Sequence, residues 1–268
     1  MDPIELARLS NVKKDYLVKL AREGKRCDGR KFDEYRAIKI EKNILKNAEG
    51  SARVKIGNTM VIAGIKLEIG EPYPDSPDKG ALSTSAELPP IASPEFEPGP
   101  PTPEAIELAR VVDRGIRESE YIEMEKLCIT PGEKVWIVFV DLHVIDYDGN
   151  LFDACLLASS AALQNTVIPN ARFGLGENVP LPVRSPPVSC TFVKFDNAIV
   201  VDPCADEEEV ADARFTVALD ENGDIRAMQK GLNGRFTIEE IKNNIKRAQF
   251  HARNIRKLLG EKNENKES

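Results

Sequence analysis

The stretch from Leu142 to Leu163, LHVIDYDGNLFDACLLASSAAL, most constrains the fold of this 268-residue chain. Its apolar and β-branched residues predict a strand ending at Asp146, and Asp148-Gly149 is typical of a tight turn. A run of small and apolar residues then predicts a helix beginning near Asn150. Such a strand–turn–helix corner is a usual anion site, because the first N–H groups of the helix are unpaired and its dipole favours negative charge.

This corner has the shape of an anion site but lacks the side chains that would hold phosphate tightly. A tight phosphate site adds hydroxyl groups and a cation at the turn. Here the turn is followed by Leu151, Phe152 and Asp153. Two large apolar groups and a carboxylate stand where donors are needed, so the sequence predicts a degenerate site.

The composition narrows the class of function. With 37 basic and 44 acidic residues, the net charge is −7, so any RNA site must be a local patch. The five cysteines are scattered without a C-x-x-C pair, which argues against a disulfide framework or zinc site and favours a reducing cytoplasm. No apolar run approaches the ~20 residues of a membrane helix, and the first residues lack a signal-peptide core. We expect a cytoplasmic protein without membrane, metal or cofactor.

Strand and helix signals recur in the order strands–helix–strands–helix, which predicts an α+β fold of two related units. Gly57-Asn58 joins a predicted hairpin over 51–69, whose second strand is expected to be covered on both faces, with Gly64 at a close backbone approach. His143 is expected to pack in the core. A proline-rich loop over 168–187 is the best domain boundary. The predicted organisation is an N-terminal segment of one or two helices at 1–29, a first domain at 30–168, a second domain at 188–259 and a fraying polar tail at 260–268.

A predicted helix over 103–119, capped by Thr102, carries a stripe of arginines. Arg110, Arg114 and Arg117 are spaced i, i+4 and i+7, opposite the apolar face of the helix. Two interpretations stay open. The arginines could bind RNA phosphates, or the stripe could be a solvated face whose cations pair with nearby acids, namely Glu107, Asp113 and Glu118.

The acidic run from Asp206 to Glu209 is a second candidate site. Clustered carboxylates can bind Mg²⁺. Consecutive residues on a loop usually point apart, however, so we expect these side chains to face water.

Several segments together resemble the RNase PH family. The hairpin from Gly50 matches the family's early G-x-A-x-V-x-x-G-x-T segment, and the corner after Asp146 is similar to its phosphate site. The similarity is greatest to non-catalytic ring subunits of archaeal exosomes, whose hallmarks match ELARVVDR at 107–114, DYDGN at 146–150 and VVDP at 200–203. The resemblance implies an RNase PH-like fold of two strands-plus-helix units, of the kind seen in the second domain of ribosomal protein S5, behind an N-terminal helical segment.

The resemblance also implies that catalytic groups are missing. Active members cleave RNA from its 3′ end with inorganic phosphate and a metal ion. They hold phosphate with a corner reading roughly G-G-[ST]-R, and they carry two aspartates six residues apart. The positions here that match these groups are Asn150, Leu151 and Phe152 at the corner, and Glu208 and Arg214 at the aspartates. An arginine at the second aspartate position would repel a metal ion.

By resemblance, the chain alternates with a catalytic homologue in a hexameric ring of three heterodimers under a trimeric RNA-binding cap. It is expected to complete the ring, to shape the partner's active site and to supply cations to single-stranded RNA. The family's non-catalytic subunit is understood to use arginines matching Arg110 and Arg114, with Arg117 a further candidate. Two alternatives stay open: an active phosphorolytic exonuclease using Glu208 and Asp212, and a structural ring protein without RNA contact, which the acidic net charge favours and the arginine stripe opposes.

Overall fold

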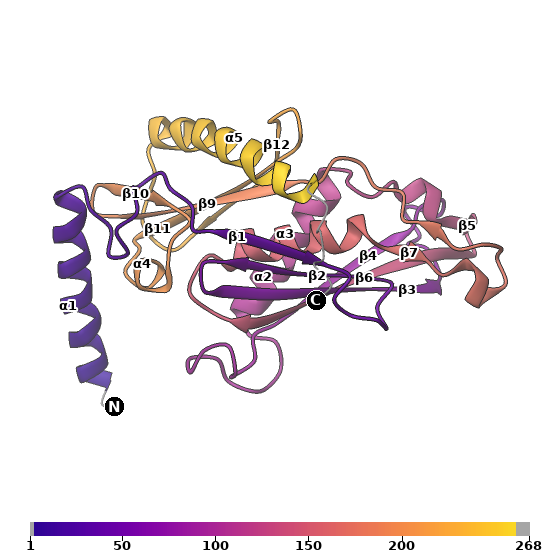
Figure 1. The fold of residues 1–268 in the computed structure, drawn as a ribbon, viewed down its shortest axis with the longest axis horizontal. Coiled ribbons are helices and arrows are strands. Elements are labelled where there is room, and N and C mark those ends of the chain that lie inside the picture. The colour runs from indigo at the N-terminus through magenta and orange to yellow at the C-terminus, as the bar shows by residue number, and fades with distance from the viewer. Residues whose placement is uncertain (1–2, 261–268) are drawn as a thin grey trace, which may run out of the picture.

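The computed structural model describes residues 3–260, with side chains from residue 12 onward, and shows an α+β fold with two main sheets (Figure 1). The N-terminal segment is a single helix, α1 (Pro3–Arg22), which stands against one end of the molecule. Apart from Gly260, the tail expected to fray lies outside the described residues.

The first sheet has six strands in the order β1-β2-β3-β6-β4, with β5 beside β6. All neighbouring strands are antiparallel except β4, which runs parallel to β6. The predicted hairpin is confirmed, since Gly57 and Asn58 connect the paired residues Ile56 and Thr59. The strands are β1 (Ile38–Lys42), β2 (Gly50–Ile56), β3 (Thr59–Gly70), β4 (Ala81–Glu87), β5 (Cys128–Thr130) and β6 (Lys134–Asp146).

Three local expectations for this sheet are wrong. Residues of β3 alternate between buried and partly exposed, so only one face of the strand is fully covered. A Cβ on Gly64 would meet only Leu45 at 3.8 Å, an ordinary contact, whereas one on Gly50 would lie 2.1 Å from Thr166 Oγ1. His143 lies on the open face of the sheet, with its side chain 44% exposed beside Glu87. The sequence of β3 is apolar on both faces, but only one face of the strand packs against the core.

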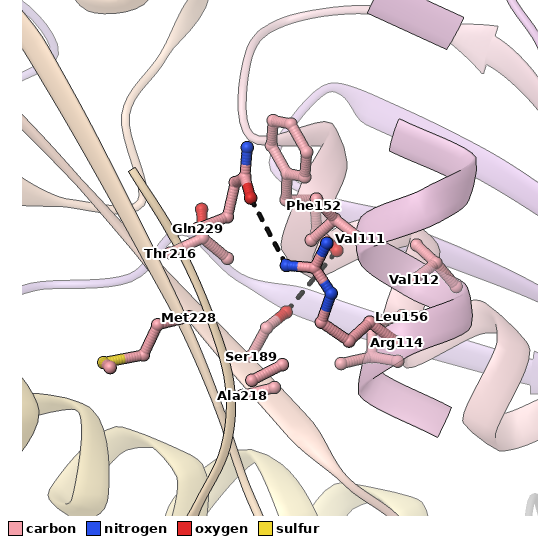
Figure 2. A pocket seen from close by; sticks show the side chains of 11 residues that line it. Val111, Val112, Arg114, Phe152, Leu156, Ser189, Thr216, Ala218, Met228 and Gln229 are labelled. Carbon is pink, nitrogen blue, oxygen red and sulfur yellow. Dashed lines mark hydrogen bonds between the residues drawn. The ribbon is translucent and has the colours of Figure 1, made fainter. Parts of the chain in front are cut away.

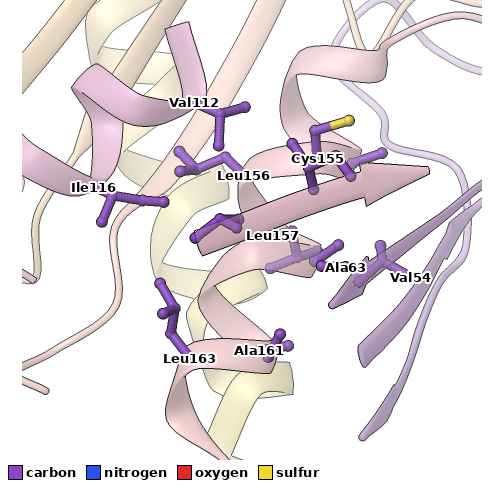
Figure 3. Packing of buried hydrophobic residues seen from close by; sticks show 14 of the residues in the cluster. Val54, Ala63, Val112, Ile116, Cys155, Leu156, Leu157, Ala161 and Leu163 are labelled. Atoms are coloured by element: carbon purple, nitrogen blue, oxygen red, sulfur yellow. The ribbon is translucent and has the colours of Figure 1, made fainter. Parts of the chain in front are cut away.

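Helix α3 (Leu151–Gln164) forms the centre of the core. Thirteen of its 14 residues are buried. It packs against β2 and β3 on one side and against β9 of the second sheet on the other. Figure 3 shows Cys155, Leu157 and Ala161 of this helix close to Val54 and Ala63 of the first sheet. The small residues of this helix thus lie where two sheets approach it.

The second sheet has four antiparallel strands in the order β10-β9-β11-β12. Helix α5 packs against β9 and β11. The short helix α4 occupies the acidic run that was expected to be a loop. The elements are β9 (Val188–Phe195), β10 (Ala198–Val201), α4 (Ala205–Glu209), β11 (Ala213–Leu219), β12 (Ile225–Gly231) and α5 (Ile238–Gly260).

Helix α2 (Pro103–Glu118) joins the two halves, since it packs against β4, α3 and β12. Its predicted cap is confirmed, because the Thr102 side chain accepts a hydrogen bond from the Ala105 N–H at 3.3 Å. The proline-rich loop over 168–187 contains only short elements; the domain limits given above stay a prediction. The connection from α2 to β5 contains η1 (Met124–Leu127). The connection from α3 to β9 contains β7 (Val167–Ile168), η2 (Asn170–Phe173) and β8 (Val179–Pro180).

Candidate functional site

The predicted strand–turn–helix corner is present between β6 and α3. Gly149 and Asn150 both have left-handed backbone conformations, with φ of 80° and 57°. A Cβ on Gly149 would lie 2.5 Å from the Cys204 carbonyl carbon, so only glycine fits at this position. Asparagine is among the few other residues that tolerate a left-handed conformation. The corner is therefore locked against the segment before α4.

A carboxylate of the chain itself fills the anion position of this corner. The Asn150 N–H donates to Glu208 Oε1 at 3.0 Å, and the Tyr147 hydroxyl donates to Glu208 Oε2 at 3.0 Å. Burial raises the pKa of Glu208 above its ordinary value. A phosphate ion bound at the same N–H group would have to displace this side chain.

A second carboxylate, Asp202, holds the corner from behind. Its side chain is fully buried and accepts hydrogen bonds from Arg36 at 2.7 Å, Arg30 at 2.9 Å and the Asn150 side chain at 2.7 Å. Burial alone would raise the pKa of Asp202, but the hydrogen bonds and charge of Arg36 bring the pKa below its ordinary value. Arg36 also donates to the carbonyl oxygens of Asp148 and Gly149. This arginine is committed to the fold and is not free to hold a ligand.

The two degenerate positions Phe152 and Arg214 pack on each other. The Arg214 guanidinium lies 4.2 Å from the centre of the Phe152 ring, and its Nη2 donates to Glu107 Oε1 at 2.7 Å. The Arg214 side chain is only 16% exposed. A cation thus stands at the position that the family resemblance is expected to assign to the second aspartate, and a positive charge there would oppose metal binding.

Sequence reasoning was wrong about the acidic run. Glu207 is buried and pairs with Arg26 at 2.6 Å, and Glu208 points to the corner. Only Asp206 and Glu209 point outward, where both pair with Lys13 of α1. The five-residue helix α4 turns Glu207 and Glu208 inward, whereas the expected loop would have left all four side chains in water.

A hollow of about 350 Å³ opens beside the corner. Tyr147, Glu208 and Arg214 line it, together with Lys13 of α1 and Glu95 of the connection between β4 and α2. The acidic side chains of the hollow make it a poor site for an anionic substrate.

The arginine stripe divides into paired and open residues. Arg117 pairs with Asp113 at 3.1 Å and donates to the Leu82 carbonyl oxygen. Arg114 makes one long contact, from Nη1 to Gln229 Oε1 at 3.5 Å, across to β12 (Figure 2). Arg110 is exposed and has no ion pair or hydrogen bond within the described part of the chain. Of the three arginines, Arg117 therefore pairs with an acid of its own helix, and among the described residues Arg110 and Arg114 do not.

The network around Glu107 is the functional feature that sequence reasoning missed. Glu107 was expected to pair within its own helix, but its Oε1 accepts from Arg214 of β11 and from Gln229 of β12. No spacing in the sequence signals this contact, because the partners lie more than a hundred residues away. The network links Arg214, beside the corner, to the helix that carries the stripe.

Two family models match the chain. Residues 34–169 match domain 1 of the 3′ exoribonuclease family, RNase PH, and residues 185–249 match its domain 2. The chain belongs to the RNase PH family. The expected family and fold are thus confirmed.

This RNase PH family chain is also similar to named exosome proteins. It is 51% identical over 251 residues to the exosome complex component Rrp42 of Methanocella arvoryzae, covering 94% of this chain and 96% of that protein. A chain of the Archaeoglobus fulgidus exosome with RNA bound to the active site has a TM-score of 0.91 and 49% identity, over 93% of this chain and 98% of that one. A chain of an archaeal exosome core has a TM-score of 0.87 and 45% sequence identity, over 94% of this chain and 98% of that one.

Membrane association was expected to be absent. Between residues 3 and 260, none of the helices combines the length and apolar character needed to cross a bilayer.

Proposed function

We propose that this chain is a non-catalytic ring subunit of an archaeal-type exosome and acts in the cytoplasm. The observation that carries the proposal is that side chains of the chain itself occupy the corner between β6 and α3. The helix N–H that would bind phosphate is taken by Glu208, and Arg214 stands at the second aspartate position, paired with Glu107. The similarity to proteins named exosome complex component Rrp42 supports the same assignment.

The alternative of an active exonuclease is opposed by the contacts of its two candidate acids. Glu208 accepts hydrogen bonds from the corner. The Asp212 carboxylate accepts from Lys14 at 2.7 Å and from the Asp196 N–H at 3.1 Å. A metal ion would have to replace these donors and bind beside the Arg214 cation.

The proposed partner is a catalytic RNase PH-like homologue. By family resemblance, this chain and the homologue would alternate in a hexamer of three heterodimers, under a trimeric RNA-binding cap. In this arrangement the chain completes the ring and shapes the active site of the partner. A solved relative of this chain is described as an exosome with RNA bound to the active site, which supports a role near RNA.

The proposed RNA contacts are Arg110 and Arg114 on α2. They lie one helical turn apart, about 6 Å along the axis, close to one backbone repeat of single-stranded RNA. Guanidinium groups suit phosphate because they offer paired donors and keep their charge. Their lack of ion pairs within the described residues leaves them available, whereas Arg117 is already paired with Asp113.

The isolated chain should show no phosphate-dependent shortening of oligo(A), even with Mg²⁺. Because Glu208 fills the corner and Arg214 repels a metal ion, neither phosphate nor Mg²⁺ can be held in the usual way. The measurement is release of nucleoside diphosphates by chain freed of contaminating nuclease. Release that stops when phosphate is withheld would overturn the non-catalytic assignment.

Replacing both Arg110 and Arg114 with Ala should weaken RNA binding by the assembled ring while leaving assembly intact, because both side chains lie opposite the buried face of α2. The slope of log K against log salt should fall by about 1.4, from ~0.7 for each phosphate contact on a single strand. The matched control is Arg53→Ala, a partly exposed arginine on β2 that pairs with Glu41. An unchanged slope and degradation rate in the double variant would favour a ring protein without RNA contact on this helix.

A further inference from the structure

Two cysteines far apart in the sequence meet at the base of α1. Cys27 is exposed, in the loop between α1 and β1, and Cys204 is buried, just before α4. Their Sγ atoms lie 3.6 Å apart although 177 positions separate the residues. Both thiols are free. The scattered spacing of the cysteines in sequence gave no sign of this pair.

The neighbours of Cys27 hold the pair in place. The Arg26 guanidinium donates to the Val201 and Asp202 carbonyl oxygens at 3.0 and 2.9 Å and pairs with Glu207. On the other side, Arg30 donates to the Asp202 carboxylate at 2.9 Å. Both anchors therefore bind the segment that precedes and contains Cys204. The fold itself brings the two Sγ atoms to 3.6 Å, about 1.6 Å more than the length of a disulfide bond.

We propose that Cys27 and Cys204 form a thiol–disulfide modification site that reacts with low-molecular-weight disulfides. The exposed Cys27 is the attacking residue and the buried Cys204 is the resolving residue. The product is a covalent link between the loop after α1 and the segment before α4.

The reaction balances as two exchange steps. The Cys27 thiolate, having lost its proton to water, attacks one sulfur of the small disulfide RSSR and releases RS⁻, leaving a mixed disulfide on Cys27. The Cys204 thiolate then attacks Cys27 Sγ and releases the second RS⁻. The two protein thiols lose two electrons and two protons, and RSSR is reduced to two RSH. A hydrogen bond with Cys204 lowers the pKa of Cys27, which favours its role as the first nucleophile.

Metal binding is the competing use of this cluster. Cys27, Cys204 and Glu207 lie close enough to share one ion. The Glu207 oxygens, however, are already bonded to Arg26 and to the Cys204 N–H. An ion would therefore face a buried guanidinium and a carboxylate that is already satisfied, whereas a disulfide needs neither to move.

The link would fasten the N-terminal helix to the second half of the molecule. Closing a loop of this length restricts the unfolded chain strongly, so the oxidised protein should resist unfolding better than the reduced protein. Without the link, contacts around Leu17 and a few ion pairs hold α1 to that part of the molecule.

The test treats the reduced, full-length, native chain with glutathione disulfide and then measures its intact mass and peptide map. We expect the mass to fall by two hydrogens, a linked peptide containing residues 27 and 204, and reversal by dithiothreitol. The thermal midpoint should rise by on the order of 5 °C.

Two single variants make the result specific. Cys204→Ser should keep one glutathione on Cys27, and Cys27→Ser, a change at an exposed site that should not disturb folding, should remain unmodified with an unchanged midpoint. A wild-type chain that keeps the glutathione adduct without a link, or that does not react, overturns the proposal. Zinc retained by the reduced wild type and lost by both variants also overturns it, in favour of a metal site.

Discussion

At the corner, one glutamate changes what a helix start can bind. Glu208 Oε1, from 58 positions away, accepts the hydrogen bond that the Asn150 N–H would otherwise donate to phosphate. The prediction that Leu151 and Phe152 offer no side-chain ligand to phosphate needs only the sequence, because the residue types decide it. The replacement by Glu208 could not be predicted from the sequence, because it depends on how α4 packs against the corner.

Other residues of the site were also beyond sequence reasoning. Arg36 and Asp202 form a buried pair at 2.7 Å that fixes the corner, yet each looks like an ordinary charged residue in sequence. Only the tertiary fold shows that the Asp202 in the VVDP stretch meets an arginine near the start of the first sheet. Buried pairs of this kind form between distant segments, so no local spacing predicts them.

Arg214→Ala should destabilise the chain. The change removes the 2.7 Å ion pair to Glu107 and the stacking on Phe152, and it leaves Glu208 with Arg36 but without Arg214 as a nearby cation. A loss of about 1–3 kcal/mol in the free energy of unfolding is expected for groups left unpaired in this way. Urea unfolding of the two proteins measures the loss.

The control for this change is Arg110→Ala, which alters an exposed arginine without partners in the described part of the chain and should stay within about 0.5 kcal/mol of wild type. If Arg214→Ala were as stable as this control, Arg214 would not be holding the degenerate site closed.

Among the elements, hairpins and helices with strong local signals could be predicted from the sequence. Which faces of a strand are covered could not. The β2–β3 hairpin and the capped helix α2 follow from turn and cap residues within a few positions. The apolar run of β3 indicated two covered faces, but the layers of the fold cover one. In the single chain, no layer of the fold fully covers the second face of β3 within the described residues. The hydrophobic periodicity of the sequence alone cannot show this.

Helix α1 depends on a small contact. Leu17 is 4% exposed and packs with Val193, Phe195 and Val210 of the second half, while Val12 is 67% exposed. Leu17→Ala should therefore loosen the docking of α1, with a cost on the order of 2 kcal/mol for a truncated buried leucine. Hydrogen exchange of the amides from 12 to 22 should become faster.

The matched control is Val12→Ala on the same helix, which should leave the exchange rates unchanged because its side chain touches little of the fold. Equal rates in the two variants would show that the ion pairs of Lys13 and Lys14, not the buried leucine, hold the helix.

On the scale of the whole molecule, the two sheets meet α3 in one continuous core, yet edges and patches stay open. Strands β1 and β4 end the first sheet, and β10 and β12 end the second. The edge strand β12 exposes Ile225 and Met228, and α5 exposes Phe250. Unpaired edges and exposed apolar side chains invite association with another chain. The structure therefore fits a subunit better than a free monomer.

Mixed with a catalytic RNase PH-like homologue, the chain should assemble one-to-one into a species near six subunits. The exposed edges need a covering surface, and symmetric closure of alternating subunits removes every open end of the ring. Native mass spectrometry of the mixture measures the stoichiometry, and the chain alone is the control. A stable 29.7 kDa monomer that ignores the homologue would contradict the ring assignment. Assembly at one-to-one that proceeds equally with Arg110 and Arg114 replaced would show that ring closure does not depend on these two arginines.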